Sequence, residues 1–488
     1  MALKTREDYI QSLKKMRPNV YKMDELITDV TTHPATKRLI ETHAIGFDGA
    51  HDEKTKDLFT KKSSITGEVV HRWTDIMTNH EEQMMNSKFK RQMFRLTGTC
   101  HASQCVGWQI LNVLWGVTHD IDKEHGTKYH ERLKNYIIKA QENGWTMAGA
   151  LTDGKGDRSL NPTKQPDPDA YVHIVERRDD GIVVRGCKAM IAAVAAANEV
   201  FVVPTTGLGP DGADYAVGFA VPRDIEGLTI VECRGPSDGR AYEGETWDYP
   251  DTDITQGYLI FDNVFVPNER VFMAGEFKYA GEFIGGFTAN YRANIGACVA
   301  GQGDNMIGSA VIVSRANGIS EKKFYDKIVD MAIYNETTYV MGIGSVALGH
   351  QHAAGNWLCD TLSAHANKYN VGYFPWLTKR LCQDICGGLV ETGCFPSYKD
   401  FQSEQYGDKL KKYFKAGPAS AEVRAKAARV AEWLTVGGGI PGCMHGGGSP
   451  DGARLVVRLH TPIEEFVGYA KRVARIDEDI PDPAANKK

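Results

Sequence analysis

The sequence has too few cysteines for a disulfide scaffold and no CxxC pair. Ten cysteines are spread over 488 residues, whereas small secreted folds that depend on disulfides are much richer in cysteine. The missing CxxC spacing argues against zinc ribbons and thioredoxin-like redox motifs. The cysteines are therefore expected to be free thiols or ligands of a metal group.

Long apolar runs and an excess of one charge are also missing. No stretch of about 18 apolar residues occurs, and the opening MALKTREDYIQSLKKM lacks the apolar segment of a secretory signal. We expect a cytoplasmic location and no membrane interaction. A net charge of -5, from 57 basic and 62 acidic residues, gives no general attraction for phosphate backbones, so nucleic acid is not an expected partner.

What is present is an ordinary globular composition in a long chain. Hydrophobic residues make up 42% and charged residues 24% of the sequence, which is typical of a folded protein. A chain of 488 residues exceeds what one hydrophobic core usually supports. Two or three domains, or one large composite fold, are expected.

The pattern of apolar residues divides the chain into three parts. Residues 1–145 show helical periodicity, as in YHERLKNYIIKAQENG, which closes on Gly144. Residues 146–275 consist of short β-branched runs separated by turns, and Asp180-Gly181 between two such runs predicts a hairpin. Helical periodicity returns over residues 276–488. We predict an N-terminal helical domain, a central β domain and a C-terminal helical domain.

This order of parts resembles the acyl-CoA dehydrogenase architecture. That resemblance implies an α+β fold in which a flavin lies between a central β-barrel and a C-terminal four-helix bundle. Order alone is weak evidence for function, because one fold supports many activities.

Several longer segments carry a more specific resemblance, in the same order along the chain. They are GALTDGKGDRSLNPTKQPDPDAYVHIVERRDDGIVVRGCKAM (149–190), FDNVFVPNERVF (261–272), HAAGNWLCD (352–360), RLCQDICGGLVETGCFPSYKDFQSE (380–404) and MHGGGSP (444–450). They are similar to the 4-hydroxybutyryl-CoA dehydratases, flavoproteins grouped with the 4-hydroxyphenylacetate 3-hydroxylases. The resemblance covers nearly the whole chain and implies FAD as cofactor and a homo-oligomer, a tetramer in this family.

The TDGKGDR turn is the first candidate for contact with the flavin. The hydroxyl of Thr152 and the backbone NH groups suit the polar rim of a flavin ring, and Lys155 and Arg158 suit its pyrophosphate. A plain surface turn held by pairing of Asp157 with Arg158 is the alternative. Lys188 and Met190, at the end of the same matching segment, complete the predicted set on this side of the cofactor.

A second flavin contact is implied by the segment QDICGG. Gln383 and Asp384 precede the pair Gly387 and Gly388, which permits close approach of the backbone to a ligand at a helix end. By resemblance, this segment meets the flavin of a neighbouring subunit. Read without the resemblance, the two glycines simply break a helix.

The stretch TGTCHASQCVG raises the question of a metal site. In the dehydratases a 4Fe-4S cluster is held by two cysteines, a histidine and a further cysteine. By resemblance, Cys105 and Cys298 occupy two of these places, either His101 or Cys100 occupies the first, and Tyr291 replaces the histidine. Phenolate is a rare ligand of such clusters. A weakly bound cluster, a single ion and no metal stay open, with Cys105 and Cys298 then as buried apolar thiols. We favour the absence of an intact cluster.

The acid and base groups that the resemblance implies are altered as well. Gln256 and Gly442 stand where the dehydratases have glutamates, and an amide cannot accept a proton near neutral pH. Tyr291, Arg292, His101 and Gln256 remain as candidate catalytic residues. Tyr291 and His101 could form a proton-transfer pair, although each could equally be a packed residue that lines the pocket.

Three functions follow from these observations. The first is a flavin-dependent lyase or isomerase that acts on a CoA thioester with altered substrate or chemistry. The second is a two-component monooxygenase that receives reduced flavin from a partner reductase and hydroxylates an aromatic acid. The third is a flavin-binding homologue whose catalysis has decayed.

Overall fold

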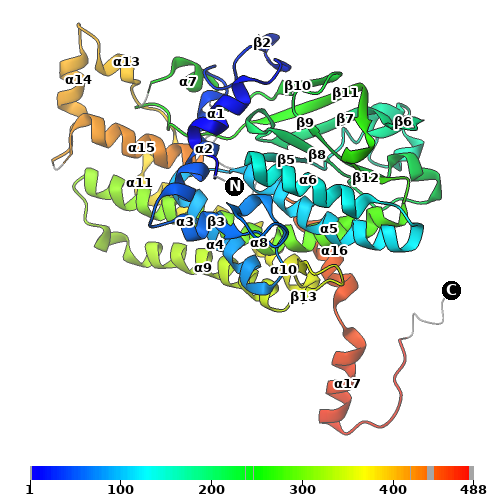
Figure 1. Cartoon of the computed structure of the whole chain (residues 1–488). Coiled ribbons are helices and arrows are strands. Elements are labelled where there is room, and N and C mark those ends of the chain that lie inside the picture. The colour runs from blue at the N-terminus through cyan, green and yellow to red at the C-terminus, as the bar shows by residue number, and fades with distance from the viewer. Residues whose placement is uncertain (1–2, 237, 246, 418, 437–444, 483–488) are drawn as a thin grey trace.

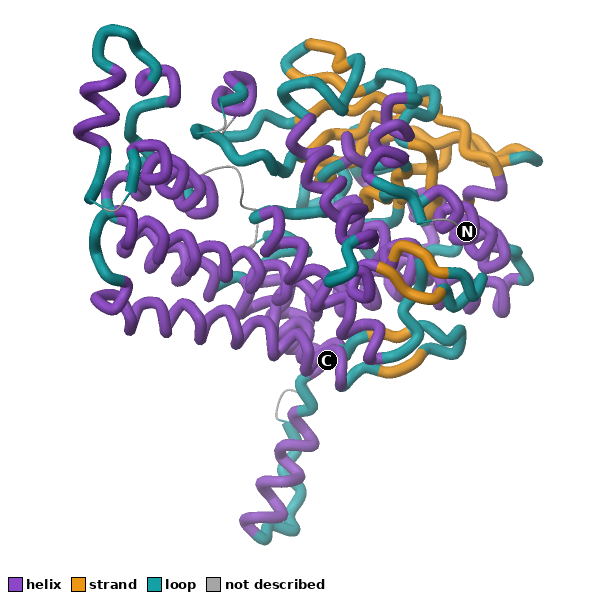
Figure 2. The backbone as a smooth tube through the Cα atoms, turned by 60° about the vertical axis from the view of Figure 1, so that its left-hand side comes forward, coloured by secondary structure: helices purple, strands orange, loops and turns teal. Residues whose placement is uncertain are grey.

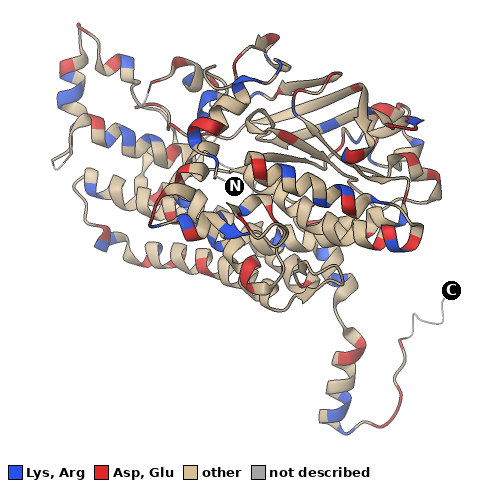
Figure 3. Ribbon diagram, in the orientation of Figure 1, with Lys and Arg blue, Asp and Glu red and all other residues tan. Residues whose placement is uncertain are grey.

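A region of β-sheet lies at the upper right of the computed structural model of the chain, with helices below it and to its left (Figure 1). The structure describes residues 3–236, 238–245, 247–417, 419–436 and 445–482. Figure 3 shows acidic and basic residues interspersed along the outer helices. In the described part of the chain, no helix combines the length and apolar character that a membrane span requires.

The N-terminal part is mainly helical, as the periodicity predicts. Its helices are α1 (Arg6–Lys14), α2 (Lys37–His51), α3 (Lys56–Phe59), α4 (His80–Thr97), α5 (Val106–His125) and α6 (Tyr129–Asn143). Helix α6 ends at Gly144 in the left-handed conformation (φ 61°), which confirms the predicted stop. Helix α4 begins behind Asn79, whose side chain accepts a hydrogen bond from the amide of Glu82.

Four short strands interrupt these helices, so the prediction of an all-helical N-terminal part is wrong in this respect. They are β1 (Val20–Lys22), β2 (Glu25–Ile27), β3 (Thr60–Lys62) and β4 (Val69–His71). Strand β1 pairs in parallel with a strand of the central region, with Val20 opposite Ile230. Three-residue strands are too short to show a two-residue alternation in sequence.

The central region forms two sheets. Its strands are β5 (Met147–Ala150), β6 (His173–Arg178), β7 (Gly181–Ala192), β8 (Glu199–Val202), β9 (Val217–Pro222), β10 (Leu228–Glu232), β11 (Gln256–Pro267) and β12 (Val271–Ala274). The larger sheet has the order β2-β1-β10-β11-β7-β6, and the smaller has the order β12-β9-β8-β5. Strands β6 and β7 are antiparallel with Arg178 opposite Gly181, which confirms the predicted hairpin at Asp180-Gly181.

The sheets do not close into a barrel, which corrects the predicted central β-barrel. A barrel requires every strand to pair with a neighbour on both sides, whereas β2, β6, β5 and β12 are edge strands here. The sheets instead pack against each other, with the rings of Phe219 and Phe261 6.0 Å apart. An isolated bridge between Asp153 and Lys188 links them at one point.

The C-terminal part is built around one long helix. Its helices are α8 (Lys278–Ala316), α9 (Tyr325–Ala347), α10 (Thr361–Val371), α11 (Phe374–Cys386), α12 (Gly388–Glu391), α13 (Tyr398–Phe401), α14 (Gly407–Phe414), α15 (Ala421–Thr435), α16 (Pro450–His460) and α17 (Ile463–Ala474). Helix α8 contacts α9, α10, α11 and α15 and also the N-terminal α4. A Cβ on Gly301 would lie 2.5 Å from the carbonyl oxygen of Arg91, so α8 and α4 approach closely.

Smaller elements connect these parts. They are α7 (Asp238–Glu243) between β10 and β11, and the hairpin of β13 (His350–Gln351) and β14 (Trp357–Leu358) between α9 and α10. The β region runs from Met147 to Ala274. The division into domains at 1–145, 146–275 and 276–488, with a C-terminal four-helix bundle, stays a proposal.

Asp253, just before β11, provides a test of the packing between the central and helical parts. Burial raises its pKa to about 6, against the opposing effect of hydrogen bonds from Tyr249 and the amide of Ile254. The folded chain therefore holds a proton that the unfolded chain releases near pH 4. This contribution to stability is present below about pH 4 and is lost as the pH rises through about 6.

We therefore expect Asp253→Asn to remove one component of the pH dependence of stability. Between pH 4 and pH 7, the free energy of unfolding of the variant should gain about 1–3 kcal/mol relative to the natural chain. Urea denaturation at several pH values measures this difference. Parallel curves for the two proteins would show that Asp253 keeps an ordinary pKa.

Candidate active site

The turn between α4 and α5 places Cys100 and Cys105 beside α8. Helix α4 ends at Gly98 in the left-handed conformation (φ 70°), and Cys105 directly precedes α5. The side-chain amide of Gln302 on α8 donates to the carbonyl oxygen of Gly98 at 3.2 Å. Cys298 lies one turn before Gln302 on the same helix, so the turn and this part of α8 are held together.

Three thiols and one phenol influence one another at this place. Burial, followed by the charges of Cys105 and Cys298, raises the pKa of Cys100 well above its usual value. Burial is also the main cause that raises the pKa of Cys298 to about 12. The pKa of Tyr291 is raised by burial and then by Cys105, Cys100 and Cys298. The structure therefore brings together Cys100, Cys105, Cys298 and Tyr291.

Lys90 of α4 is a charged group in this site that the sequence analysis missed. Its side chain is 1% exposed, and its ammonium nitrogen lies 5.7 Å from the centre of the Tyr291 ring. Its charge lowers the pKa of both Cys298 and Cys100 against the larger effect of burial. The sequence does contain a signal that Lys90 is buried, because it belongs to a set of positions with the three-and-four spacing of a buried helix face. These are Gln83, Ser87, Lys90, Phe94 and Thr97.

His101 packs against aromatic rings. Its ring lies edge-on to Phe89 at 5.3 Å and to Phe94 at 5.8 Å. Neither ring nitrogen has a hydrogen-bond partner among the described residues. Burial, followed by the charges of His43 and Lys90, lowers the pKa of His101 well below its usual value. His101 is thus a neutral ring in an aromatic pocket, and the described part of the chain shows no hydrogen bond between it and Tyr291.

The donors around the turn do not form a site for a single metal ion. Within the described ranges, no group of three or more His, Cys, Asp or Glu side chains could hold such an ion. Ligands of one zinc ion all lie about 2.0–2.3 Å from it. The thiolates of an iron-sulfur cluster bind different iron atoms and so lie further apart. The thiols of Cys100, Cys105 and Cys298 are the donor type that such a cluster prefers.

A glycine turn covers the other side of Tyr291. The guanidinium Nε of Arg292 donates to the carbonyl oxygen of Gly447 at 3.0 Å. A Cβ on Gly447 would lie 2.7 Å from the Tyr291 ring, and one on Gly448 would lie 2.7 Å from a terminal nitrogen of Arg292. Both glycines have positive φ. Burial lowers the pKa of Arg292 to about 10.

Arg292 has no carboxylate partner among the described ion pairs. A buried guanidinium without an acidic partner is costly unless a ligand or water satisfies it, so this group is suited to bind negative charge. Gly442, which stands where the dehydratases have a second glutamate, lies outside the described residues.

Gln256 opens β11 and is paired with Ala192 at the end of β7. Its carbonyl oxygen accepts a hydrogen bond from the amide of Cys233 at 2.7 Å. The side chain is half-buried. In the part of the chain that the structure describes, no hydrogen bond links it to Tyr291, Arg292 or the thiols, so its catalytic assignment stays a prediction.

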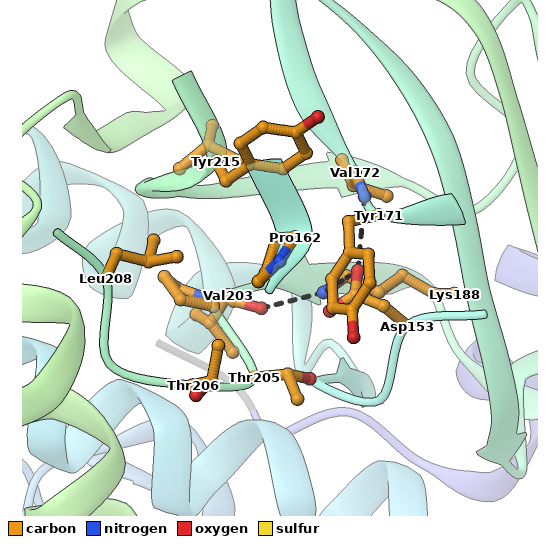
Figure 4. A pocket seen from close by; sticks show the side chains of 12 residues that line it. Asp153, Pro162, Tyr171, Val172, Lys188, Val203, Thr205, Thr206, Leu208 and Tyr215 are labelled. Carbon is orange, nitrogen blue, oxygen red and sulfur yellow. Dashed lines mark hydrogen bonds and ion pairs between the residues drawn. The ribbon is translucent and has the colours of Figure 1, made fainter. Parts of the chain in front are cut away.

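The predicted flavin turn is anchored by a buried ion pair (Figure 4). The ammonium of Lys188 lies 2.7 Å from the Asp153 carboxylate, and both side chains are almost fully buried. It also donates to the carbonyl oxygens of Leu151 at 2.7 Å and Val203 at 2.9 Å. Because an ammonium has three donors, Lys188 is fully used inside the protein. It therefore supports the turn rather than offering a donor to a ligand.

The remaining members of this turn lie nearer the surface. The carbonyl oxygen of Thr152 accepts from the amide of Ala189 at 2.8 Å, while Met190 is 57% exposed. The carboxylate of Asp157 accepts hydrogen bonds from the amide and hydroxyl of Ser159. Among the described residues no ion pair joins Asp157 to Arg158, so the alternative of a turn held by that pairing is not seen, and Oδ1 of Asp157 accepts from Ser159 instead.

Lys155 and Arg158 are the two cations of this turn. Neither makes an ion pair with a carboxylate in the described part of the chain. Two unpaired cations on a turn that is fixed from below suit a pyrophosphate. The residues present therefore fit a flavin dinucleotide on this side.

The glycine pair at 387–388 lies elsewhere in the chain. Arg380, Gln383, Asp384, Gly387, Gly388 and Glu391 line an open recess, and the Asp384 carboxylate is 2.7 Å from the Lys327 ammonium. No residue is shared with the recess around Asp153 and Lys188, and α11 lies far from β7 in Figure 1. One chain therefore does not bring the two predicted flavin segments together.

The order of elements places the chain in the class of acyl-CoA dehydrogenase-like folds. A structure of glutaryl-CoA dehydrogenase with glutaryl-CoA superposes with a TM-score of 0.51 at 14% identity, covering 93% of each chain. At this identity the likeness shows the fold alone. The oxygenase component of 4-hydroxyphenylacetate 3-monooxygenase, solved with FAD, superposes with a TM-score of 0.84 at 21% identity, over 97% of this chain and 100% of that one.

The family itself is shown by sequence. Residues 5–273 match the family described as 4-hydroxyphenylacetate 3-hydroxylase N terminal, and residues 280–475 match its C-terminal counterpart. The chain belongs to the 4-hydroxyphenylacetate 3-hydroxylase family, which confirms the resemblance seen in the sequence.

Two relatives are similar over almost the whole length. The 4-hydroxybutyryl-CoA dehydratase/vinylacetyl-CoA-Δ-isomerase of Clostridium aminobutyricum is 35% identical over 491 residues, 97% of this chain and 100% of the relative. The structure of an oxygen-tolerant archaeal 4-hydroxybutyryl-CoA dehydratase from N. maritimus superposes with a TM-score of 0.95 at 33% identity, over 99% and 97% of the two chains. The relatives of this chain are enzymes.

Proposed function

We propose that the chain is an FAD-dependent lyase or isomerase of the 4-hydroxybutyryl-CoA dehydratase type that acts on a CoA thioester. The observation that carries this proposal is the 35% identity to a dehydratase over 97% of the chain. The substrate or the chemistry is altered, because Gln256 stands where the resemblance implies a glutamate and Tyr291 stands where it implies a histidine. An amide at Gln256 can orient a substrate by hydrogen bonds but cannot remove a proton from it.

In this proposal FAD, when bound, supplies a reversible acceptor of electrons. The turn with Thr152, Lys155, Asp157 and Arg158 holds it on one side, and the ion pair beneath this turn fixes its position. Gln383, Asp384, Gly387 and Gly388 hold it from a neighbouring copy of the chain. The separation of the two segments within one chain supports this division between copies.

Tyr291 and Arg292 are the proposed catalytic groups on α8. The phenol of Tyr291 is protonated at neutral pH, as phenols ordinarily are, and burial raises its pKa further, so its hydroxyl is present as a donor toward a negative charge that develops on the substrate. The guanidinium of Arg292 stabilises the negative charge on a thioester carbonyl oxygen. The glycine turn at 447–448 holds both side chains from one side and leaves no space for a larger residue.

Anaerobic purification followed by cofactor and turnover measurements tests the proposal. We expect close to one FAD per chain, and conversion of a hydroxyacyl-CoA or enoyl-CoA from a panel that includes 4-hydroxybutyryl-CoA. The panel of free acids is the matched control and should give no turnover. Flavin binding without conversion of any thioester would overturn the lyase or isomerase assignment.

A reduced-flavin-dependent aromatic monooxygenase is the alternative function. It is favoured by the match of both parts of the chain to families named after 4-hydroxyphenylacetate 3-hydroxylase. Oxygen consumption and hydroxylation of a phenolic acid on addition of a flavin reductase would support it. A protein that binds FAD and gives neither reaction would support the decayed homologue.

A homo-oligomer is part of the proposed function, and α17 is its expected contact. This helix projects away from the rest of the chain (Figures 1 and 2), and its apolar side chains are solvent-exposed, including Val473 at 85%. An amphipathic helix with an unburied apolar face is stabilised by a partner surface. A second copy of the chain would bury this face.

Ending the chain after Thr461 is expected to lower the oligomeric state without unfolding the protein. The truncation removes the exposed apolar helix and leaves the described core intact. Light scattering gives the mass, and circular dichroism verifies the fold. Truncation after Ile476, which retains α17, is the control and should assemble normally. An unchanged mass without α17 would place the interface elsewhere.

A further inference from the structure

The wall of the recess at the glycine pair continues into a segment without regular structure. Helix α12 supplies Gly388 and Glu391 to this recess, and residues 393–397 behind it form neither helix nor strand. The carbonyl oxygens of such a segment have no partners within a helix or a sheet, so they need donors from elsewhere. The position of α12 therefore depends on what holds residues 393–397 in place.

Arg429 of α15 supplies these donors. Its Nη1 donates to the carbonyl oxygen of Gly393 at 3.1 Å, and its Nη2 donates to the carbonyl oxygen of Phe395 at 3.1 Å. The Cζ atom of the guanidinium lies 3.7 Å from the centre of the Phe395 ring, a distance at which a cation–π interaction is favourable. One buried side chain thus holds two carbonyl groups and one ring of the segment.

Two buried carboxylates hold the guanidinium in this orientation. Oδ1 of Asp248 accepts from Nε of Arg429 at 3.4 Å, and Oδ2 accepts from the amide of Tyr398, the first residue of α13, at 2.7 Å. Glu432, about one turn further along α15, lies 3.7 Å from Nη1 of Arg429 and is itself paired with Arg240 of α7. A buried network in which the charges are paired and hydrogen-bonded makes its surroundings rigid.

Helix α12 also packs directly on α15. Val390 is fully buried and belongs to the same core cluster as Ala428 and Ala431 of α15. A Cβ on Gly393 would lie 3.3 Å from a carboxylate oxygen of Glu432, and the φ of Gly393 is positive (64°). The chain therefore turns closely over α15 at the end of α12, and the wall of the recess is seated on that helix.

We propose that Arg429 is a positioning residue for the recess, because it fixes residues 393–397 and thereby the α12 wall with Gly388 and Glu391. Arg429 does not itself line the recess. The inference rests on the proposed function, in which this recess holds the flavin of a neighbouring copy. A lysine cannot replace the arginine fully, because an ammonium lacks the planar fork that joins both carbonyl groups, the carboxylate and the ring in one geometry.

Titration of the full-length apoprotein with FAD tests the role of Arg429. We expect Arg429→Met to weaken FAD binding about tenfold, the lower end of the range found when groups that support ligating residues in metal sites are removed. The visible circular dichroism of the flavin at saturation should also change, because it reports the geometry around the ring. Arg429→Lys should lie between Arg429→Met and the natural chain in both measurements.

Arg424→Met is the matched control. Arg424 lies on the same helix, donates to the carbonyl oxygen of Phe414 at 2.8 Å, and has its guanidinium 4.8 Å from the Phe414 ring. It makes the same kinds of contact as Arg429, but to α14 instead of the segment behind α12. Arg424→Met should therefore bind FAD as the natural chain does. Urea denaturation of each apoprotein gives its stability, and if Arg429→Met does not fold, Arg429→Lys against Arg424→Lys decides.

Gln383→Ala, which alters the recess directly, separates this inference from the proposed function. Weak FAD binding in Gln383→Ala with natural affinity in Arg429→Met would overturn the role of Arg429 and leave the proposed function intact. Natural affinity in both variants would overturn the placement of the flavin in the recess. An Arg429→Met protein whose saturated flavin has the natural dichroism spectrum would show that Arg429 stabilises the fold without positioning the recess.

Discussion

Lys188→Met is expected to lower the free energy of unfolding by about 3–5 kcal/mol and to weaken flavin binding. The substitution leaves the Asp153 carboxylate buried without its partner, and a lone buried charge is costly. It also frees the carbonyl oxygens of Leu151 and Val203, which Lys188 binds now. The turn with Lys155 and Arg158 then loses the support that fixes it.

Urea denaturation and a flavin titration measure these two effects. Arg178→Met is a suitable control, because Arg178 pairs with Glu176 on the surface, where both side chains are about half exposed, and such pairs contribute about 0–1 kcal/mol. A stability loss in Lys188→Met no larger than that of the control would show that the pair is not buried as described. Normal FAD affinity in a folded variant would show that the turn does not hold the cofactor.

Tyr291→Phe is expected to lower kcat about 100-fold or more on the proposed thioester substrate and to leave the fold unchanged. The phenylalanine keeps the ring stacked on Phe287, now 5.4 Å away, and loses the hydroxyl proposed to donate a proton. Removal of a general acid typically costs a factor of about 100 to 10,000 in rate.

Steady-state kinetics with the substrate found in the panel measure this effect. Tyr279→Phe is the matched control, since Tyr279 also lies on α8 but its hydroxyl donates to Glu124, away from the thiols. It should keep kcat near that of the natural chain. An unchanged kcat in Tyr291→Phe would show that the phenol takes no part in the chemistry.

Local patterns predict the large elements of this fold well. Helix α6 ends on the predicted Gly144 and the β6–β7 hairpin turns at Asp180-Gly181, because both signals depend on backbone conformations that glycine adopts easily. The predictions of a central β-barrel and of a purely helical N-terminal part were wrong. Both depend on pairing between distant segments, such as Val20 with Ile230, and local periodicity carries no information about such pairing.

The candidate site shows the same limit. The sequence pointed to Cys105, Cys298 and Tyr291, and the structure brings these residues together. The sequence could not decide whether Cys100 or His101 takes the first position, because this depends on how the 3-10 turn directs two adjacent side chains. Lys90 was missed, since a lysine within a helical segment is usually solvated. Its role depends on α8, which is about 200 residues away in sequence.

Several groups of the candidate site lie on the long helix α8 and would move together with it. Tyr291, Arg292 and Cys298 lie on one uninterrupted helix of 39 residues, so the first and last of them are about 10 Å apart along its axis. A sliding or tilting motion of this rod would displace the proton donor, the guanidinium and the sulfur by similar amounts. Substrate-induced changes at one of them should therefore be detectable at the others.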